Sequence, residues 1–222
     1  MFSNLLLDMD GTIINSSPGI YKSFCLACDS LLLPCPAFNE FSPLIGPPIQ
    51  KIALHFYPNI NQVQLEMFRK IFRADYDTKS FLIAEWYPDV CDTIKYLKDR
   101  DINMTIVTNK PTKPAIKLVE EGGFLSCIDR IIGIDYPAFR FSTPVFKSKA
   151  ESLAYVFNSA HYCLEESIYL GDTPSDQEAC NQCGLSFVAA LYGFHKWISL
   201  SRPQLYIGKF TEIRSFFYPD SS

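Results

Sequence analysis

An apolar segment near the amino terminus ends abruptly in two carboxylates. Leu5–Leu7 runs directly into Asp8, and Asp10, Gly11 and Thr12 follow. A strand this apolar is typical of a parallel sheet buried on both faces, and open α/β sheets bind ligands at the carboxyl ends of their strands. Because unpaired buried carboxylates are costly, the two acids indicate either a ligand site at this strand end or a pair of surface acids in a turn.

The composition excludes several classes of protein. The 222 residues can form one large domain, or a core domain with a smaller one. The formal net charge is −4, which does not favour a nucleic-acid surface. No apolar run reaches the roughly 18 to 20 residues that a membrane span needs. We therefore expect neither a nucleic-acid nor a membrane partner.

The amino terminus and the cysteines both bear on the compartment. The terminus lacks the features of a signal peptide, and the motif at Asp8 leaves little room for a leader, so we expect a cytoplasmic protein. The eight cysteines fit a reducing compartment. Two pairs have the CxxC spacing, Cys25/Cys28 and Cys180/Cys183, and together they could indicate a zinc site. Both pairs lie in helix-like patterns, so we expect thiols in the core instead.

The pattern of apolar residues changes along the chain. Residues 18–33, 49–56 and 63–76 have helical periodicity, and prolines interrupt the sequence between them. From residue 87 onward, short apolar segments alternate with helical patterns, as in an α/β fold with a parallel sheet. We expect strands near 104–108, 128–134, 167–170 and 186–190.

Polar side chains follow three of the expected strands. Asp8 and Asp10 follow the first, Thr108 and Asn109 the second, and Asp172 the third. Since the carboxyl ends of parallel strands meet at one edge of the sheet, these groups should lie together. Asp176 and a lysine, at position 147 or 149, complete the set. Hard oxygen ligands beside hydroxyl, amide and ammonium groups predict a phosphate bound next to a magnesium ion.

These motifs resemble those of the haloacid dehalogenase superfamily of phosphohydrolases. The family signatures DxDGT and GDxxxD match residues 8–12 and 171–176, and the strand-end hydroxyl matches Thr108. The family lysine, often within KPxPE, best matches Lys147 in Lys147-Ser148-Lys149-Ala150-Glu151. Lys149 is the alternative, because both prolines are missing and the register is degenerate.

The resemblance implies a role for each residue. Asp8 would be the nucleophile that forms an aspartyl-phosphate, and Asp10 the general acid and base. Asp8, the backbone carbonyl of Asp10, and Asp172 would bind Mg²⁺, with Asp176 supporting them. The phosphoryl group would be bound by Thr108, Asn109 and Lys147. Asp176 could instead be only a helix cap.

The resemblance also implies two domains, with a Rossmann-like core at residues 1–15 and 84–222 and an α-helical cap at residues 16–83. A loop at residues 44–49 is similar to a cap loop of phosphoglycolate phosphatase-like members. Gly46 and Lys51 are therefore candidate specificity residues, although Lys51 could be an ordinary surface lysine. The aromatic segment 134–146 departs from the family pattern and could pack in the core or reshape the entrance.

The expected function is hydrolysis of a small phosphomonoester such as phosphoglycolate, a nucleotide or a sugar phosphate. A phosphomutase of the same superfamily and a catalytically silent phosphate-binding regulator are the alternatives. The intact acids at positions 8, 10 and 172 favour an enzyme over the silent regulator. The sequence leaves a monomer and a homodimer equally open.

Overall fold

The computed structural model describes residues 2–141, 145–159, 162–197 and 203–218. Contacts divide the chain into two compact units. The core unit comprises Met1–Ile14 and Trp86–Ser222, and the helical unit comprises Asn15–Glu85. The divisions lie close to the expected domain boundaries at residues 15 and 84, and the short strands β2 (Ile14–Asn15) and β3 (Glu85–Trp86) pair where the chain crosses between the units.

The core unit alternates strands and helices along the chain. Its strands are β1 (Asn4–Leu7), β4 (Asn103–Val107), β5 (Arg130–Ile132), β6 (Ser167–Gly171), β7 (Ser186–Ala190) and β8 (Tyr206–Ile207). Its α-helices are α5 (Val90–Lys98), α6 (Thr112–Glu121), α7 (Tyr136–Phe141), α8 (Lys149–Ser159) and α9 (Pro174–Cys183), and a 3₁₀-helix spans Phe210–Phe216. The expected fold class, α/β with a parallel sheet, is confirmed.

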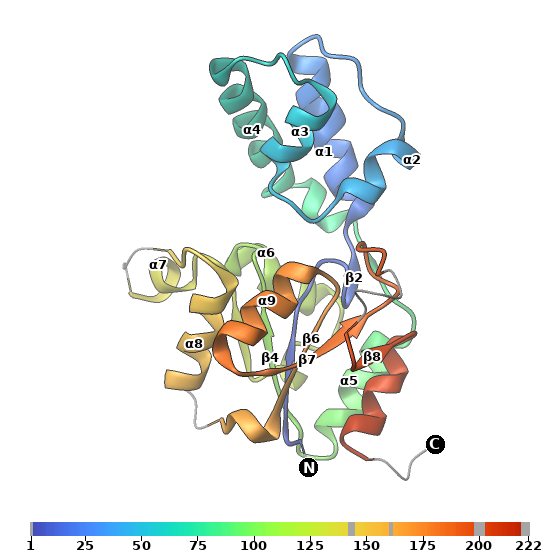
Figure 1. Ribbon diagram of the computed structural model, residues 1–222, viewed down its shortest axis with the longest axis vertical. Helices are drawn as coiled ribbons and strands as arrows, with labels where there is room; N and C mark the ends of the chain where they lie inside the picture. Colours follow the sequence, from blue (N-terminus) through green and yellow to red (C-terminus); the bar gives the residue numbers. More distant parts are fainter. Residues whose placement is uncertain (1, 142–144, 160–161, 198–202, 219–222) are drawn as a thin grey trace. The chain divides into compact units, whose positions relative to one another are not determined.

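The six strands form one sheet in the order β5-β4-β1-β6-β7-β8, and each neighbouring pair is parallel (Figure 1). In the register of the central strands, Leu7 pairs with Ile106 on one side and with Leu170 on the other. β1 ends at Leu7, and β4 and β6 each continue for one residue more, to Val107 and Gly171, so the three strands end at the same edge of the sheet. The register alone brings Asp8, Thr108 and Asp172 to that edge.

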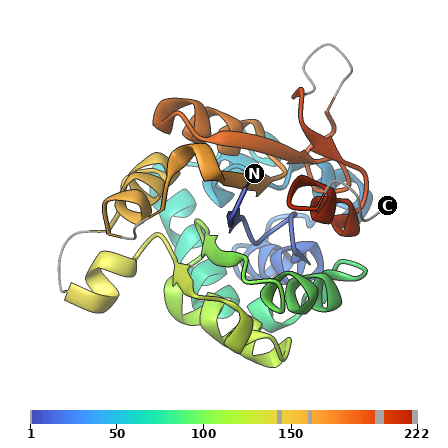
Figure 2. The same cartoon turned by 90° about the horizontal axis from the view of Figure 1, so that it is seen from below.

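Helices cover both faces of the sheet. Figure 2 shows α5 and α6, in green, on one side of β1, and α8 and α9, in orange, on the other. On the α8 and α9 side, Leu6 and Tyr169 from the sheet pack in one cluster with Val156 and Cys180 from the helices. Leu5 and Leu7 alternate to the opposite face and are also fully buried. The apolar run Leu5–Leu7 of β1 is thus explained by burial on both faces.

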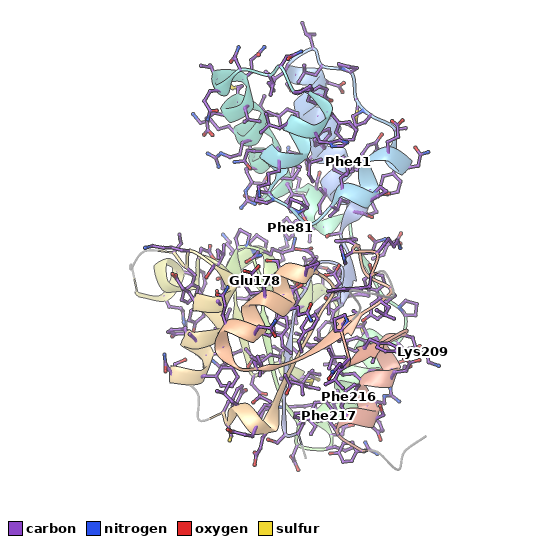
Figure 3. All side chains as sticks on the ribbon, viewed as in Figure 1. Phe41, Phe81, Glu178, Lys209, Phe216 and Phe217 are labelled. Carbon is purple, nitrogen blue, oxygen red and sulfur yellow. A yellow bond between two sulfur atoms is a disulfide. The ribbon has the colours of Figure 1, made fainter. Side chains whose placement is uncertain are left out.

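The helical unit contains α1 (Ser17–Ser30), α2 (Phe38–Phe41), α3 (Ile49–Phe56) and α4 (Gln62–Tyr76). Phe24 of α1 is its centre, with ring centroids 4.7 Å from Phe41 and 4.9 Å from Phe68. Phe41, labelled in Figure 3, is fully buried. Asp75 at the end of α4 accepts hydrogen bonds from the hydroxyls of Ser23 and Ser80, which tie α4 to α1 and to the chain beyond it.

The expectation that Cys25 is a thiol in the core is wrong. Cys25 near the end of α1 forms a disulfide with Cys35, ten residues along the chain. The tyrosines Tyr21 and Tyr57 hold the same loop by donating hydrogen bonds to the carbonyls of prolines 36 and 34. The CxxC spacing was misleading because the partner of Cys25 is supplied by the returning loop. Cys28 is a buried free thiol, as expected.

Several elements differ from the expectations. Helix α1 ends at Ser30, before the expected end of its periodicity at residue 33, and β5 is shorter than residues 128–134. The aromatic segment after β5 forms α7, and Tyr136 and Phe146 pack against Tyr155 of α8. Residues 142–144 of that segment lie outside the described residues. Among the helices that the structure describes, none is both long and apolar enough to cross a membrane.

Candidate active site

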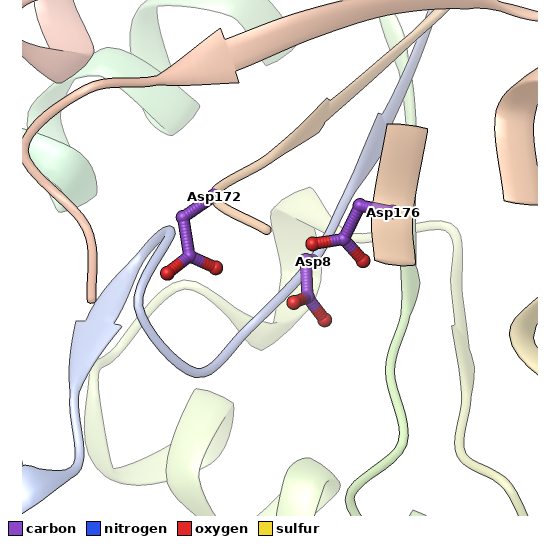
Figure 4. A group of neighbouring side chains, drawn as sticks. All are labelled: Asp8, Asp172 and Asp176. Carbon is purple, nitrogen blue, oxygen red and sulfur yellow. The ribbon is translucent and has the colours of Figure 1, made fainter. Parts of the chain in front are cut away.

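Three buried carboxylates meet at the carboxyl edge of the sheet. Asp8 follows β1, Asp172 follows β6, and Asp176 lies in the first turn of α9 (Figure 4). One oxygen from each lies within 4.8 Å of the others. The backbone N–H of Asp8 donates to the carbonyl of Leu170 at 2.9 Å, which continues the pairing of β1 and β6 and fixes the nucleophile candidate beside Asp172.

The ammonium among these carboxylates belongs to Lys149, and the preference for Lys147 is wrong. Lys149 Nζ lies 3.0 Å from Asp8 Oδ1 and also contacts Asp176 Oδ1. Lys147 is exposed, and its backbone N–H donates to the Glu151 carboxylate at 2.8 Å. Lys149 is the first residue of α8, and this start of the helix directs its side chain into the site. The resemblance of residues 147–151 to KPxPE placed the lysine two positions too early.

The buried charges change one another's proton affinities. Burial raises the pKa of Asp8 to about 7, although the neighbouring Lys149 acts in the opposite direction. Burial, followed by repulsion from Asp8 and Asp176, raises the pKa of Asp172 well above its ordinary value. For Lys149, burial lowers the pKa, but Asp176 and Asp8 outweigh it, so the pKa lies above its ordinary value. The single ammonium of Lys149 therefore does not offset the burial and mutual repulsion of the carboxylates of Asp8 and Asp172.

Asp10 lies beside a lysine that the sequence analysis did not consider. Lys110 Nζ is 3.2 Å from Asp10 Oδ1, and the lysine side chain is almost completely buried. Lys110 follows Thr108 and Asn109 at the end of β4. The rule that brought those two residues to the edge of the sheet extends to the next residue, and that signal was available in the sequence.

Thr108 and Asn109 have different environments. Thr108 is buried, and its hydroxyl oxygen accepts the backbone N–H of Lys110 at 3.1 Å. Since that bond occupies an acceptor position, the hydroxyl proton stays available for a phosphoryl oxygen. Asn109 is exposed. Its role in binding phosphate stays a prediction.

Asp172 is held by a fourth strand end, which the sequence analysis also missed. The backbone N–H of Phe194, in the loop after β7, donates to Asp172 Oδ2 at 2.8 Å. A Cβ on Gly193 would lie 2.2 Å from Cβ of Asp172, and one on Gly11 would lie 2.2 Å from its Oδ2. Two glycines thus allow two loops to close tightly around this carboxylate. The strand expected at residues 186–190 could have indicated the loop.

Asp176 is both a capping residue and a partner of Lys149. The N-cap of α9 is Thr173, whose backbone N–H and hydroxyl donate to Asp176 Oδ2 at 3.0 and 2.6 Å. Its other oxygen contacts Lys149. The cap interpretation was therefore correct in kind, although the helix begins before Asp176. The capping box leaves Oδ1 directed to the ammonium.

The donor set fits a hard divalent cation. Carboxylate oxygens are the ligands that Mg²⁺ prefers, and three buried ones converge here. Among the side chains described at this edge, four carboxylates face the two ammonium groups of Lys110 and Lys149. Two negative charges remain when all six groups are ionised, which a divalent cation would balance. Asp8, Asp172 and Asp176 are the side chains that could hold it.

The specificity candidates lie in the helical unit. Gly46 is exposed, with a backbone φ of 137° that favours glycine, in the loop before α3. Lys51 is exposed on α3. Their part in substrate choice stays a prediction.

Comparison with known proteins identifies the family. A family model described as haloacid dehalogenase-like hydrolase matches residues 5–190. The chain belongs to this family. The matched range contains every acid and lysine of the site, so the resemblance drawn from the motifs is confirmed.

Relatives of this haloacid dehalogenase-like hydrolase have been named by activity. It is 25% identical over 197 residues to phosphoglycolate phosphatase 1 of Pseudomonas aeruginosa, covering 86% of this chain and 70% of that protein. It is 27% identical over 219 residues to phosphoglycolate phosphatase of Pectobacterium atrosepticum, covering 94% and 89%. A haloacid dehalogenase-like hydrolase from Streptococcus pneumoniae has the same fold, with a TM-score of 0.84, 23% identity, and 97% and 98% coverage.

Proposed function

We propose that this hydrolase is a magnesium-dependent phosphatase of small phosphomonoesters, with phosphoglycolate as the first candidate substrate. The observation that carries the proposal is the contact of Lys149 with Asp8 at the edge of the sheet where Asp172 and Asp176 also converge. A carboxylate nucleophile 3.0 Å from an ammonium, with two more carboxylates whose oxygens lie within 4.8 Å of it, suits phosphoryl transfer with a bound cation. The names of the relatives from Pseudomonas and Pectobacterium support the substrate.

In the first step, an oxygen of Asp8 attacks phosphorus, and the bond from phosphorus to the alcohol oxygen breaks. Asp10 gives its proton to the departing oxygen, so an alcohol and an aspartyl-phosphate are formed. In the second step, Asp10 takes a proton from water, which attacks phosphorus and releases inorganic phosphate from Asp8. Asp8 and Asp10, which are two residues apart in the sequence, thus have separate roles, one as the nucleophile and the other as the general acid and base.

The surrounding groups bind and orient the phosphoryl group. Lys149, and the hydroxyl of Thr108, would donate to its oxygens. Bound Mg²⁺ would supply positive charge that offsets the repulsion between the phosphate and Asp8, a repulsion of about 4 kcal/mol at 4 Å and an effective dielectric of 20. Asp8, Asp172 and Asp176, with the backbone carbonyl of Asp10, would hold the cation.

The helical unit would act as the cap that selects the substrate. Gly46 permits a loop conformation that side chains disfavour, and Lys51 could pair with a carboxylate or second phosphate of the substrate. Closure of such a unit would exclude water from the site. Lys51→Met should then raise KM for phosphoglycolate more than for a phosphoester without a second anionic group.

The test is release of inorganic phosphate from a panel of phosphoglycolate, nucleotide and sugar phosphates, with and without Mg²⁺. The wild type should release phosphate only with Mg²⁺, and Asp8→Asn should abolish release. Asp99→Asn, an exposed acid after α5, is the matched control and should keep full activity. Phosphate transfer between sugars without release would indicate a mutase instead. Magnesium binding without turnover of any compound would contradict the proposal.

A further inference from the structure

Lys110 is buried beside the acid and base candidate, although it belongs to none of the motifs that indicated the site. Its side chain is 1% exposed, and its Nζ lies 3.2 Å from Oδ1 of Asp10. Burying an ammonium is costly unless a partner compensates it. A lysine in this position is therefore held where its charge can act on Asp10.

The backbone of Lys110 is fixed from two strands. Its N–H donates to the hydroxyl of Thr108 at 3.1 Å, and its carbonyl accepts the N–H of Ile134 at 3.3 Å. A Cβ on Gly133 would lie 2.6 Å from that carbonyl oxygen, so glycine permits the close approach of the chain after β5. The ends of β4 and β5 together determine the position of the Lys110 backbone, from which its side chain extends.

The two oxygens of Asp10 differ in their surroundings. Oδ1 is buried, and no group among the described residues donates a well-aligned hydrogen bond to it. The Asp10 side chain nevertheless keeps 28% of its surface exposed. Hydrogen bonds at catalytic groups are often poorly aligned without substrate and shorten when it binds. A small rotation would turn the contact with Lys110 into such a bond and leave Oδ2 for the substrate.

We infer that Lys110 is a positioning residue, whose ammonium holds Oδ1 of Asp10 and thereby directs Oδ2 at the leaving oxygen and then at water. The inference rests on the proposed phosphatase function. It predicts an effect that depends on the leaving group, because proton donation matters only when the leaving group needs a proton. An alkoxide needs one, whereas p-nitrophenolate departs without it.

The experiment compares two substrates, glycerol phosphate and p-nitrophenyl phosphate, in the 222-residue chain with Mg²⁺, and phosphoglycolate is measured as a third. Lys110→Met removes the charge and keeps most of the side-chain volume. Lys117→Met, on the exposed face of α6, is the matched control. We measure kcat/KM, which reports the steps up to departure of the alcohol. Lys110→Met should lower it by about 100-fold for glycerol phosphate, the size of a general-acid contribution, and far less for p-nitrophenyl phosphate.

Two further readouts separate positioning from a structural role. If Asp10 is misdirected as a base, Lys110→Met should release p-nitrophenolate in a burst of one equivalent and then turn over slowly, because the aspartyl-phosphate accumulates. Lys110→Arg, which keeps the charge, should recover part of the loss with glycerol phosphate. Thermal unfolding establishes that each variant is folded, and the arginine variant serves if the methionine variant is not.

The inference is overturned by an equal loss of kcat/KM for both substrates, by no loss in either, or by a rise of KM confined to phosphoglycolate. The last result would make Lys110 a contact for the substrate's second anionic group. Failure of the wild type to hydrolyse any phosphoester would instead contradict the phosphatase function itself. The two failures are therefore distinguishable.

Discussion

One ammonium, that of Lys149, contacts both Asp8 and Asp176, and all three side chains are buried. The acids come from different segments, the end of β1 and the first turn of α9, while the lysine opens α8. The position of the nucleophile candidate therefore depends on helices that are distant from it in the sequence.

Replacing Lys147 and Lys149 by methionine, one at a time, separates their roles. Lys149→Met should lower kcat by about 100-fold or more, because a buried charge that stabilises the transferring phosphoryl group is lost. Lys147→Met should leave kcat unchanged, because that side chain is exposed. Steady-state phosphate release checks both. A large loss in the Lys147 variant with a normal Lys149 variant would contradict the assignment.

Lys149→Met should also lower the free energy of unfolding. Lys149→Met leaves the carboxylates of Asp8 and Asp176 buried without their ammonium, and breaking such a pair typically costs about 3–5 kcal/mol. Urea unfolding without Mg²⁺ should show a decrease of this order, and Mg²⁺ should restore part of it. An unchanged unfolding midpoint would mean that the ion pairs contribute little.

Asp172→Asn should weaken binding of Mg²⁺ by more than about tenfold, because a charged ligand becomes neutral. The same change should stabilise the protein without Mg²⁺ at neutral pH, since burial and the neighbouring acids disfavour the charge on Asp172. Calorimetric titration with Mg²⁺ and thermal unfolding measure the two effects. Destabilisation of the metal-free variant would show that the hydrogen bonds from Thr12 and Phe194 outweigh the repulsion.

Stabilisation by Mg²⁺ should increase with pH. The pKa of Asp8 is raised by burial to about 7, whereas in the unfolded chain an aspartate titrates near pH 4. Between these values the folded state binds more protons than the unfolded state, so without Mg²⁺ this group lowers stability as the pH rises. Protons compete with the cation, so the Mg²⁺-induced rise in Tm should be larger at about pH 8 than at about pH 5.5.

The control for this pH dependence is Asp172→Asn, in which the Mg²⁺-induced shift should be small at both pH values. An equal shift of the wild type at both would contradict the raised pKa of Asp8, because no proton would then be displaced by the cation.

Reducing the Cys25–Cys35 disulfide should destabilise the helical unit. Closing a loop of ten residues restricts the unfolded chain and stabilises the folded one by about 2–3 kcal/mol. Thermal unfolding with and without dithiothreitol measures the effect. The double variant Cys25→Ser and Cys35→Ser should be insensitive to the reductant. Full alkylation of both thiols in the unreduced native protein would contradict the disulfide.

Much of the fold could be predicted because the pattern of apolar residues reflects local geometry. The helix at residues 49–56 and the strand at residues 186–190 were predicted at the bounds that the structure has. Predictions were poorer where polar residues begin an element. Asp176 was considered as the cap of a helix, but the N-cap of α9 is Thr173. Pro174 and Ser175, which belong to no apolar pattern, therefore lie inside the helix.

The site could be predicted where it depends on strand ends. Asp8, Thr108 and Asp172 directly follow apolar strands, and the parallel register brings them to one edge. Lys110 and the N–H of Phe194 were missed although both also lie at strand ends. Their positions after β4 and β7 could have indicated them, but only the distances to Asp10 and Asp172 show which groups they contact.

The sequence by itself determined the family, the α/β class and the convergence of the acids, because these depend on apolar periodicity and on short motifs at strand ends. Only the tertiary structure decided between Lys147 and Lys149, joined Cys25 to Cys35, and placed Lys110 against Asp10. These contacts depend on where a helix begins and on how loops return. Segments that lie apart in the chain determine both, so no local pattern records them.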